Sequence, residues 1–236
     1  MTKSSIHQGG LLLLLATLLS GAARAQSVDF NFSSLGTALI AFDGSGSALS
    51  FSPDAATGYD FQIGSSSLPG LVGYTGVIAG NFTIGQVTSF GMGFFQGEDA
   101  TVTGSGRLSI FDGSNPPLTA DITWNTVATL GTEGVLNSIG TPNLSNFAYS
   151  GSNPVLTQLA GASGGTVAAS FQFLPTESLG NLAAGGGTNA TTFSGSLEAI
   201  PENQNTVAIL GGLVLLGAIA IRGHGRRNSV AGVPNS

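Results

Sequence analysis

Short runs of alternating apolar and polar residues, each interrupted by glycine, serine or asparagine, fill the chain from residue 26 to residue 200. A period of two is typical of strands with one buried face. No stretch keeps the i, i+3, i+4 spacing of a long helix, and Leu130–Leu136 and Val155–Leu159 predict a helical turn at most. We therefore expect an all-β domain. The clearest strand patterns are residues 59–63, 107–111, 120–124 and 168–173.

One local motif occurs three times in this region: an aromatic residue, Asp or Ser, Gly, Ser, three residues of any kind, and Leu. Glycine in such a motif can take the positive φ of a tight turn, so each copy predicts a hairpin. Three hairpins predict an antiparallel β-sandwich, jelly-roll-like, over residues 26–198. We expect Trp124 and Phe111 among its core aromatics. The copies begin at Phe42, Phe111 and Tyr149.

The charge of this region is strongly one-sided. Between residues 26 and 200, eleven acidic residues face a single basic residue, Arg107, for a net charge of −10. Binding to a nucleic-acid backbone depends on Lys and Arg that neutralise phosphates. The composition therefore excludes nucleic acid as a partner, and an anionic membrane surface is equally unsuitable.

Two residue types that carry much of enzyme chemistry are missing from this domain. Cysteine is absent from the chain, and the two histidines, His7 and His224, lie near its ends. Disulfides, thiolate metal sites, cysteine nucleophiles, a Ser-His-Asp triad and the common zinc sites are thereby excluded from the domain. We expect a protein that is not an enzyme and binds no cofactor, apart from the calcium considered below.

The N-terminus has the anatomy of a secretory signal peptide. Lys3 precedes an apolar core at Leu11–Leu19, and Ala23-Arg24-Ala25 is an A-x-A cleavage site. The apolar core is short for a bilayer span of about 20 residues, which favours a cleaved signal over an uncleaved anchor. Residues 1–25 are therefore predicted to be removed.

The other end of the chain predicts a membrane segment. Residues 206–221 carry no charge, and at about 1.5 Å per residue a helix of this length approaches the thickness of the hydrocarbon core. A cluster of Arg222, Arg226 and Arg227 follows, as in a stop-transfer signal with its basic end in the cytoplasm. We expect one C-terminal transmembrane helix here, with a buried core helix as the alternative.

The order Pro201-Glu202, apolar helix and arginine cluster resembles the PEP-CTERM sorting signal of Gram-negative bacteria. The resemblance covers residues 199–227, and a short tail, 228–236, continues beyond it. Asn203 stands where the family has its second proline. The resemblance implies cutting near Pro201 by an exosortase-type processing enzyme, and release or attachment at the outer surface. The alternative is a single-pass protein that keeps its helix in the inner membrane.

Carboxylates are the remaining candidates for chemistry. Calcium takes oxygen ligands from carboxylates and carbonyls in Gly- and Ser-rich turns, but the spaced acids of a calcium-binding loop are missing. A glycosidase needs two carboxyl groups, whereas neighbours such as Glu98 and Asp99 point to opposite faces of a strand. Structural use in turns is the alternative to a calcium site. The weak metal candidates are Asp43, Asp112, Glu98 and Asp99.

Three hypotheses for function follow. The first is a non-enzymatic exported protein of the cell surface or extracellular matrix, sorted or anchored through residues 199–227. The second is a carbohydrate-binding β-sandwich at the cell surface, in which Tyr59, Tyr74 or Tyr149 would stack on extracellular polysaccharide rather than pack in the core. The third is a glycoside-active enzyme.

Overall fold

The computed structural model describes residues 27–201 except 45–46, 93–95, 115, 131–135, 141–142 and 186–187. These residues belong to one compact unit, Gln26–Glu202. In the described part of the chain, fourteen strands form a single antiparallel sheet. The strands are β1 (Val28–Ser34), β2 (Leu39–Asp43), β3 (Ala48–Ser52), β4 (Phe61–Ser66), β5 (Thr75–Ile84), β6 (Thr88–Phe90), β7 (Gly97–Phe111), β8 (Leu118–Thr123), β9 (Thr126–Leu130), β10 (Leu136–Gly140), β11 (Asn143–Ala148), β12 (Ala162–Phe171), β13 (Thr188–Thr191) and β14 (Phe193–Pro201).

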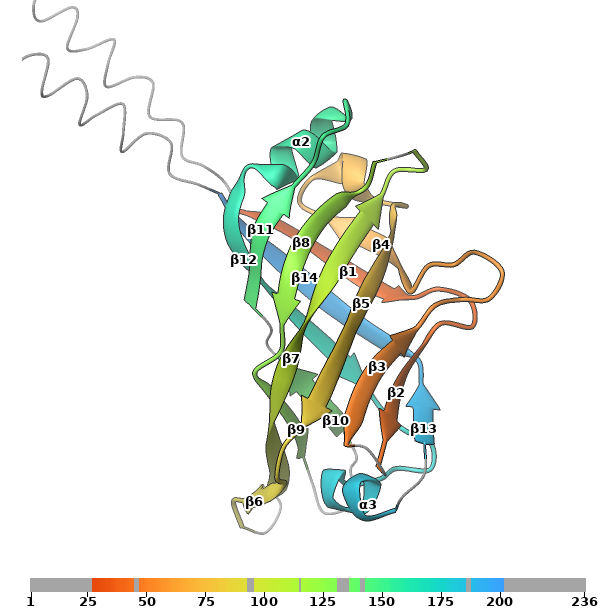
Figure 1. The fold of residues 1–236 in the computed structure, drawn as a ribbon, viewed down its shortest axis with the longest axis vertical. Helices are drawn as coiled ribbons and strands as arrows, with labels where there is room; N and C mark the ends of the chain where they lie inside the picture. Colours follow the sequence, from red (N-terminus) through yellow and green to blue (C-terminus); the bar gives the residue numbers. More distant parts are fainter. Residues whose placement is uncertain are drawn as a thin grey trace, which may run out of the picture. The chain divides into compact units, whose positions relative to one another are not determined.

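Eight of these strands close into a barrel (Figure 1). The ring runs β7-β8-β11-β12-β14-β1-β4-β5, and β5 returns to β7 along ten residue pairs from Thr75↔Phe111 to Ile84↔Val102. The predicted sandwich is therefore wrong, because a closed ring of paired strands replaces two separate sheets. The period-two pattern does not distinguish the two folds, since both bury alternate residues.

Strand β7 joins the closed ring to the rest of the sheet. Its first part, to Thr101, pairs with β9, whereas Gly106 to Ile110 pair with β8. Gly104 lies where β7 changes partner, at φ +115°, and a Cβ there would lie 2.2 Å from the carbonyl oxygen of Asn81. Only glycine fits this position, because side chains rarely take such a φ and the neighbouring backbone leaves no room.

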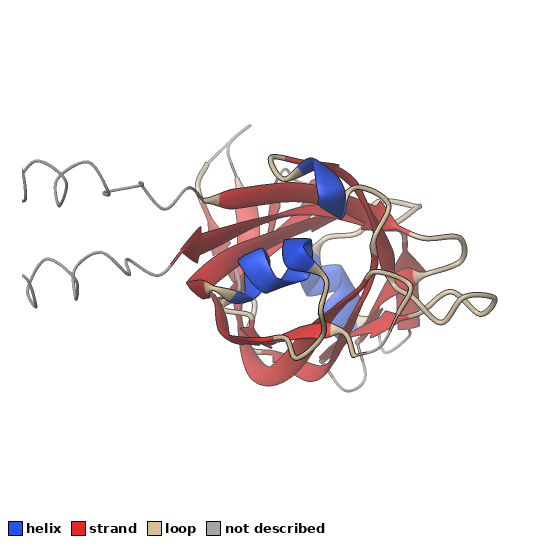
Figure 2. Cartoon of the chain, turned by 90° about the horizontal axis from the view of Figure 1, so that it is seen from above, coloured by secondary structure: helices blue, strands red, loops and turns tan. Residues whose placement is uncertain are grey.

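Further strands lengthen the barrel at the end that carries β6. Strands β3, β2 and β13 continue from β5, while β9 and β10 continue from β7 and reach β12. Two short helices, α2 (Pro154–Ala160) and α3 (Leu179–Ala184), and a 3-10 turn, η1 (Pro69–Leu71), complete the described fold. Seen along the barrel, the helices lie across the space that the strands enclose (Figure 2). Leu156, Leu159, Leu179 and Leu182 bury their side chains in the core.

The interior is filled by phenylalanines that pack over glycines on neighbouring strands. Phe61 stands opposite Gly76, and Phe32 opposite Gly195. A Cβ on either glycine would lie 2.2 to 2.4 Å from the facing ring. Small residues beside large ones allow an eight-stranded barrel to hold aromatic side chains without voids. The barrel interior is thus a packed core.

Two of the three predicted hairpins are confirmed. Phe42 pairs with Leu49 between β2 and β3, and Leu118 pairs with Ile110 between β8 and β7. The third is wrong, because the segment after Tyr149 enters helix α2. Asn153 caps that helix and Pro154 occupies its first turn, which starts a helix rather than a strand.

The aromatic predictions divide in a similar way. Trp124 is 4% exposed and lies in the core, as expected. Phe111 lies outside the core cluster and is half-buried, which corrects the prediction. The reason is its register, since Ile110 beside it points inward.

The described residues include no helix long and apolar enough to cross a membrane. The predicted transmembrane helix, residues 206–221, lies outside the described residues, as do the signal peptide 1–25 and the tail 228–236.

Candidate functional site

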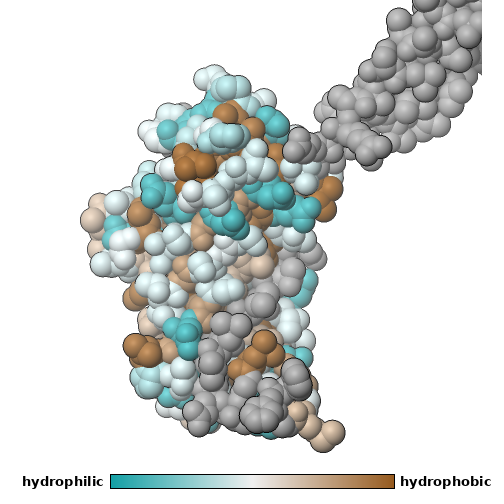
Figure 3. All heavy atoms as spheres, turned by 180° about the vertical axis from the view of Figure 1, so that it is seen from behind, coloured by the Kyte–Doolittle hydropathy of each residue, from teal (hydrophilic) through white to brown (hydrophobic). Residues whose placement is uncertain are grey.

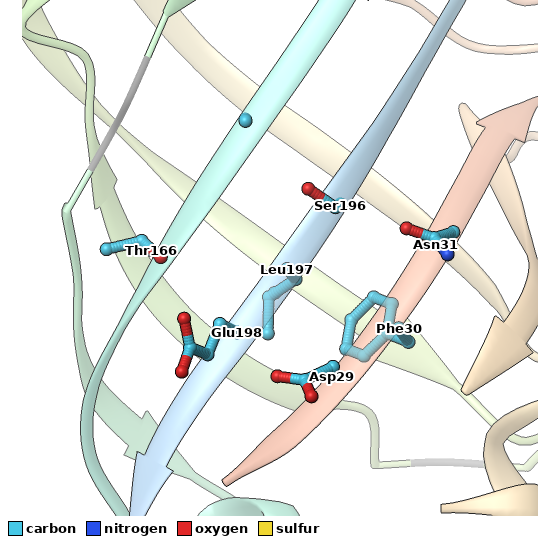
Figure 4. Close-up of a pocket in the computed structure, with 8 residues that line it drawn as sticks. Asp29, Phe30, Asn31, Thr166, Ser196, Leu197 and Glu198 are labelled. Carbon is cyan, nitrogen blue, oxygen red and sulfur yellow. The ribbon is translucent and has the colours of Figure 1, made fainter. Parts of the chain in front are cut away.

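A shallow hollow of about 240 Å³ lies over strands β12, β14 and β1 (Figure 4). Asp29 stands opposite Glu198, and Asn31 opposite Ser196. All four residues are exposed, whereas Phe30 and Leu197 between them are buried, so the hollow is on the outer wall of the barrel. Small side chains form the hollow, because Ser196 stands opposite Ala168 while longer residues surround them. We call these residues the polar hollow; they are Asp29, Asn31, Thr166, Ala168, Ser196 and Glu198.

The polar hollow carries negative charge, and none of the residues that line it is basic. Like charges that face each other across two strands repel, as Asp29 and Glu198 do here. The one ion pair among the described residues joins Arg107 and Asp121 elsewhere on the wall, at 4.0 Å and with both side chains largely exposed. The hollow therefore offers hydrogen-bond acceptors to hydroxyl or amino groups.

This arrangement differs from a glycosidase centre. Facing residues on neighbouring strands have Cβ atoms about 5 Å apart, close to the carboxyl spacing of a retaining enzyme. Such an enzyme keeps its acid in an apolar pocket, whereas Asp29 and Glu198 both stand exposed on an open wall. The geometry does not support acid–base catalysis.

The predicted metal candidates do not come together. Glu98 and Asp99 lie at the start of β7 and Asp112 just beyond its end, about 45 Å apart along the strand at 3.3 Å per residue. Asp43 ends β2 and pairs with Thr188. Glu98 accepts a hydrogen bond from the main-chain N–H of Gly180, and Asp99 one from Thr88. Within the described residues, no group of three or more His, Cys, Asp or Glu is placed to hold a metal ion.

Asp112 instead belongs to a hydrogen-bonded cluster around Asn153. The Asn153 amide nitrogen donates to Asp112 at 2.6 Å and to the Tyr74 hydroxyl at 2.8 Å. Its main-chain N–H donates to the Tyr149 hydroxyl at 3.0 Å. Hydrogen bonds from Ser114 and then from Asn153 hold the pKa of Asp112 below its usual value. Tyr74 and Tyr149 also pack against the core, so this cluster engages both their rings and their hydroxyls.

Asp54 organises the loop between β3 and β4. One carboxylate oxygen accepts from the N–H and hydroxyl of Thr37, at 2.9 and 2.7 Å, and the other from those of Thr57, at 3.0 and 2.8 Å. These hydrogen bonds, those from Thr37 first, hold the pKa of Asp54 far below its usual range. The Asp54 N–H also donates to the carbonyl of Tyr59 at 2.9 Å. The loop that carries Tyr59 is therefore rigidly held.

Asp60 is a buried carboxylate whose second oxygen has no hydrogen-bond partner in the described structure. The side chain is 1% exposed, and one oxygen accepts from the N–H of Ile78 at 2.6 Å. Burial raises the pKa of Asp60 above its usual value, only partly offset by the hydrogen bond from Ile78. The protonated form therefore suits the folded barrel better than the charged form.

We expect Asp60→Asn to remove a pH-dependent loss of stability. Because the pKa of Asp60 is raised in the folded state, its contribution to the free energy of unfolding is complete below about pH 4. This contribution declines as the pH rises through the raised pKa. The free energy of unfolding of the variant, relative to that of the natural protein, should therefore increase as the pH rises from 4. Urea unfolding at several pH values from 4 to 8 measures the difference. Parallel curves for the two proteins would contradict the assignment.

Among the sorting and cleavage residues, the structure describes only Pro201. It ends β14, where it pairs with Ala162 of β12. The remaining residues lie outside the described part of the chain: Glu202, Arg222, Arg226, Arg227, Ala23 and Ala25.

Sequence reasoning missed the polar hollow. Its residues are far apart in the chain, and only the pairing of β1, β14 and β12 brings Asp29, Glu198 and Thr166 into one row. The available signal was the alternation of apolar and polar residues within each strand. It predicts which face of the sheet a residue lies on but not which residues of other strands lie beside it.

Comparisons of the chain with protein-family models, with curated proteins and with solved structures found no match.

Proposed function

We propose that this is a non-enzymatic exported protein of the cell surface or extracellular matrix, sorted or anchored through its C-terminal segment 199–227. An exosortase-type enzyme at the inner membrane would be its processing partner. The proposal rests on the agreement between two sets of boundaries, one from sequence motifs and one from the folded unit.

That agreement is the observation that carries the proposal. The first strand begins at Val28, three residues after the expected cleavage at Ala25, and the last strand ends at Pro201, where the sorting motif begins. The compact unit spans Gln26–Glu202. Cleavage after Ala25 and just beyond Pro201 would therefore leave every described strand of the barrel intact, including the last residues of β14.

The surface of the barrel is consistent with this role. A cluster of buried hydrophobic side chains fills the interior, and on the face drawn in Figure 3 hydrophilic and intermediate residues are mixed with scattered hydrophobic ones. The charge between residues 26 and 200 is strongly negative. Such a protein meets its surroundings through its wall rather than through an internal cavity.

The boundaries can be tested by intact mass. Protein isolated from the cell surface or medium should begin near Gln26 and end near Pro201 or Glu202. The control is the variant Pro201→Ala-Glu202→Ala, which should keep the C-terminal segment if the motif is read. Mature surface protein that still carries Arg226 and Arg227 would contradict exosortase processing. Cytoplasmic protein with residues 1–25 attached would contradict export.

A further inference from the structure

A row of five uncharged polar side chains, followed by one phenylalanine, crosses six neighbouring strands of the outer wall. The strands are β12, β14, β1, β4, β5 and β7, and each contributes one residue that pairs with the residue on the next strand. Facing residues on paired strands point to the same side of a sheet. Each is exposed or half-buried. At about 4.8 Å between strands, the row is about 24 Å long. We call it the hydroxyl row; its members are Ser170, Ser194, Ser33, Gln62, Thr75 and Phe111.

The row ends on an aromatic pair that the core does not use. The rings of Tyr59 and Phe111 lie 5.2 Å apart at 51°, both are half-buried, and neither packs in the core cluster. Among the described residues, the Tyr59 hydroxyl makes no hydrogen bond, which leaves it open to a ligand. The aromatic pair presents an apolar platform at the end of a line of hydrogen-bonding groups.

This platform is held in place before any ligand arrives. The hydrogen bond from the Asp54 N–H fixes the Tyr59 carbonyl, and Asp54 is itself held by Thr37 and Thr57. The Gln62 amide is oriented by a hydrogen bond to the carbonyl of Gly73 at 3.2 Å. Groups that are already ordered lose little conformational entropy on binding.

The charge of the site selects the chemistry of the ligand. No member of the hydroxyl row is charged, yet the domain as a whole carries net charge −10. The polar hollow adjoins the row, because its residues Asn31 and Ser196 lie two positions from Ser33 on β1 and from Ser194 on β14. An anionic polymer would be repelled. A neutral polysaccharide offers hydroxyl groups to Ser, Thr and Gln, and the apolar faces of its sugar rings to Tyr59 and Phe111.

We infer that the hydroxyl row and the Tyr59–Phe111 pair form a binding track for a neutral polysaccharide. The inference rests on the proposed cell-surface location, where such a polymer is within reach. The aromatic pair anchors one sugar unit and the polar side chains of β5, β4 and β1 bind the units that follow. The barrel then acts as an attachment point between the cell and its surrounding polymer.

The test is affinity electrophoresis of the full chain in mild detergent through gels that contain hydroxyethylcellulose, dextran or alginate. We expect retardation by at least one of the two neutral polymers and none by anionic alginate. Tyr59→Ala should raise the apparent Kd about tenfold, the effect of losing roughly 1.4 kcal/mol of aromatic contact. Phe111→Ala is a second variant with the same expected result, and thermal melts check that both remain folded.

The matched control is Phe90→Ala. Phe90 is also an exposed aromatic, 39% accessible, but it pairs with Gly97 at the opposite end of β7 from Phe111. Its loss should leave retardation unchanged. Equal retardation of all variants, or none by either neutral polymer, would overturn the binding track. The proposed location is tested separately by protease treatment of intact cells. A protein that is digested at the cell surface but binds no polymer would contradict the binding track and leave the proposed location standing.

Discussion

Gly104→Ala should destabilise the barrel by about 3 kcal/mol or more, from backbone strain at positive φ together with overpacking. The residue has φ +115°, and the added Cβ would lie 2.2 Å from the carbonyl oxygen of Asn81. Backbone cannot move aside as the tip of a side chain can. Because β7 changes partner from β9 to β8 around this residue, the substitution strains the strand on which barrel closure depends. Urea unfolding followed by circular dichroism measures the loss.

Gly64→Ala is the matched control. It lies in β4, a strand of the same ring, and a Cβ there would meet nothing within 4 Å. Alanine also loses less chain entropy than glycine on folding, so the stability should stay the same or rise slightly. If both variants lost the same free energy, the effect would come from glycine replacement in general rather than from the positive φ and the close contact with Asn81 at Gly104.

Asn153→Ala should cost about 2 to 3 kcal/mol, because one side chain serves both as a helix cap and as a bridge. Its carbonyl oxygen accepts from the N–H of Val155 and of Leu156, which starts α2. Its amide holds Tyr74 and Asp112, from two further loops. Removal should loosen α2 from the loops around it. The shift in the midpoint of thermal or urea unfolding measures the loss.

Two variants separate the roles of Asn153. Ser178→Ala removes only a cap, since Ser178 accepts from the N–H of Asn181 at the start of α3, and should cost about 1 kcal/mol. Asn153→Asp keeps a cap oxygen but sets a carboxylate against Asp112. Its destabilisation should shrink as the pH falls toward 4 and one carboxyl group takes up a proton. A loss for Asn153→Ala no larger than that for Ser178→Ala would contradict the bridging role.

The strand content and the local turns could be predicted because they depend on neighbours in the chain. Alternation marked β7, β8 and β12, and the glycine motifs marked the hairpins at Phe42 and Phe111. The copy at Tyr149 failed because Asn153 and Pro154 are strong helix-starting residues that the motif ignored. The motif leaves the three residues before Leu unspecified, so it cannot distinguish the start of a helix from a hairpin turn.

The candidate site could be predicted only in part. Tyr59 was recognised as a residue that could stack on a sugar, but Tyr74 and Tyr149 looked equivalent to it. The difference lies in contacts between distant segments, since Asn153 donates hydrogen bonds to the hydroxyls of the latter two and their rings pack against the core. Of the carboxylates proposed for calcium, Glu98 and Asp99 lie at one end of β7 and Asp112 beyond the other, so the length of one strand separates them, and Asp43 lies on β2.

By itself, the sequence determined the all-β class, the acidic and cysteine-free character of the domain, and the two motif-bearing ends, because composition and local periodicity carry these properties. Only the tertiary structure decided between a sandwich and a closed barrel. Closure depends on the pairing of β5 with β7, and the hydroxyl row on the register of six strands. Register is a relation between segments far apart in the chain, and alternation constrains it only to the correct face of each strand.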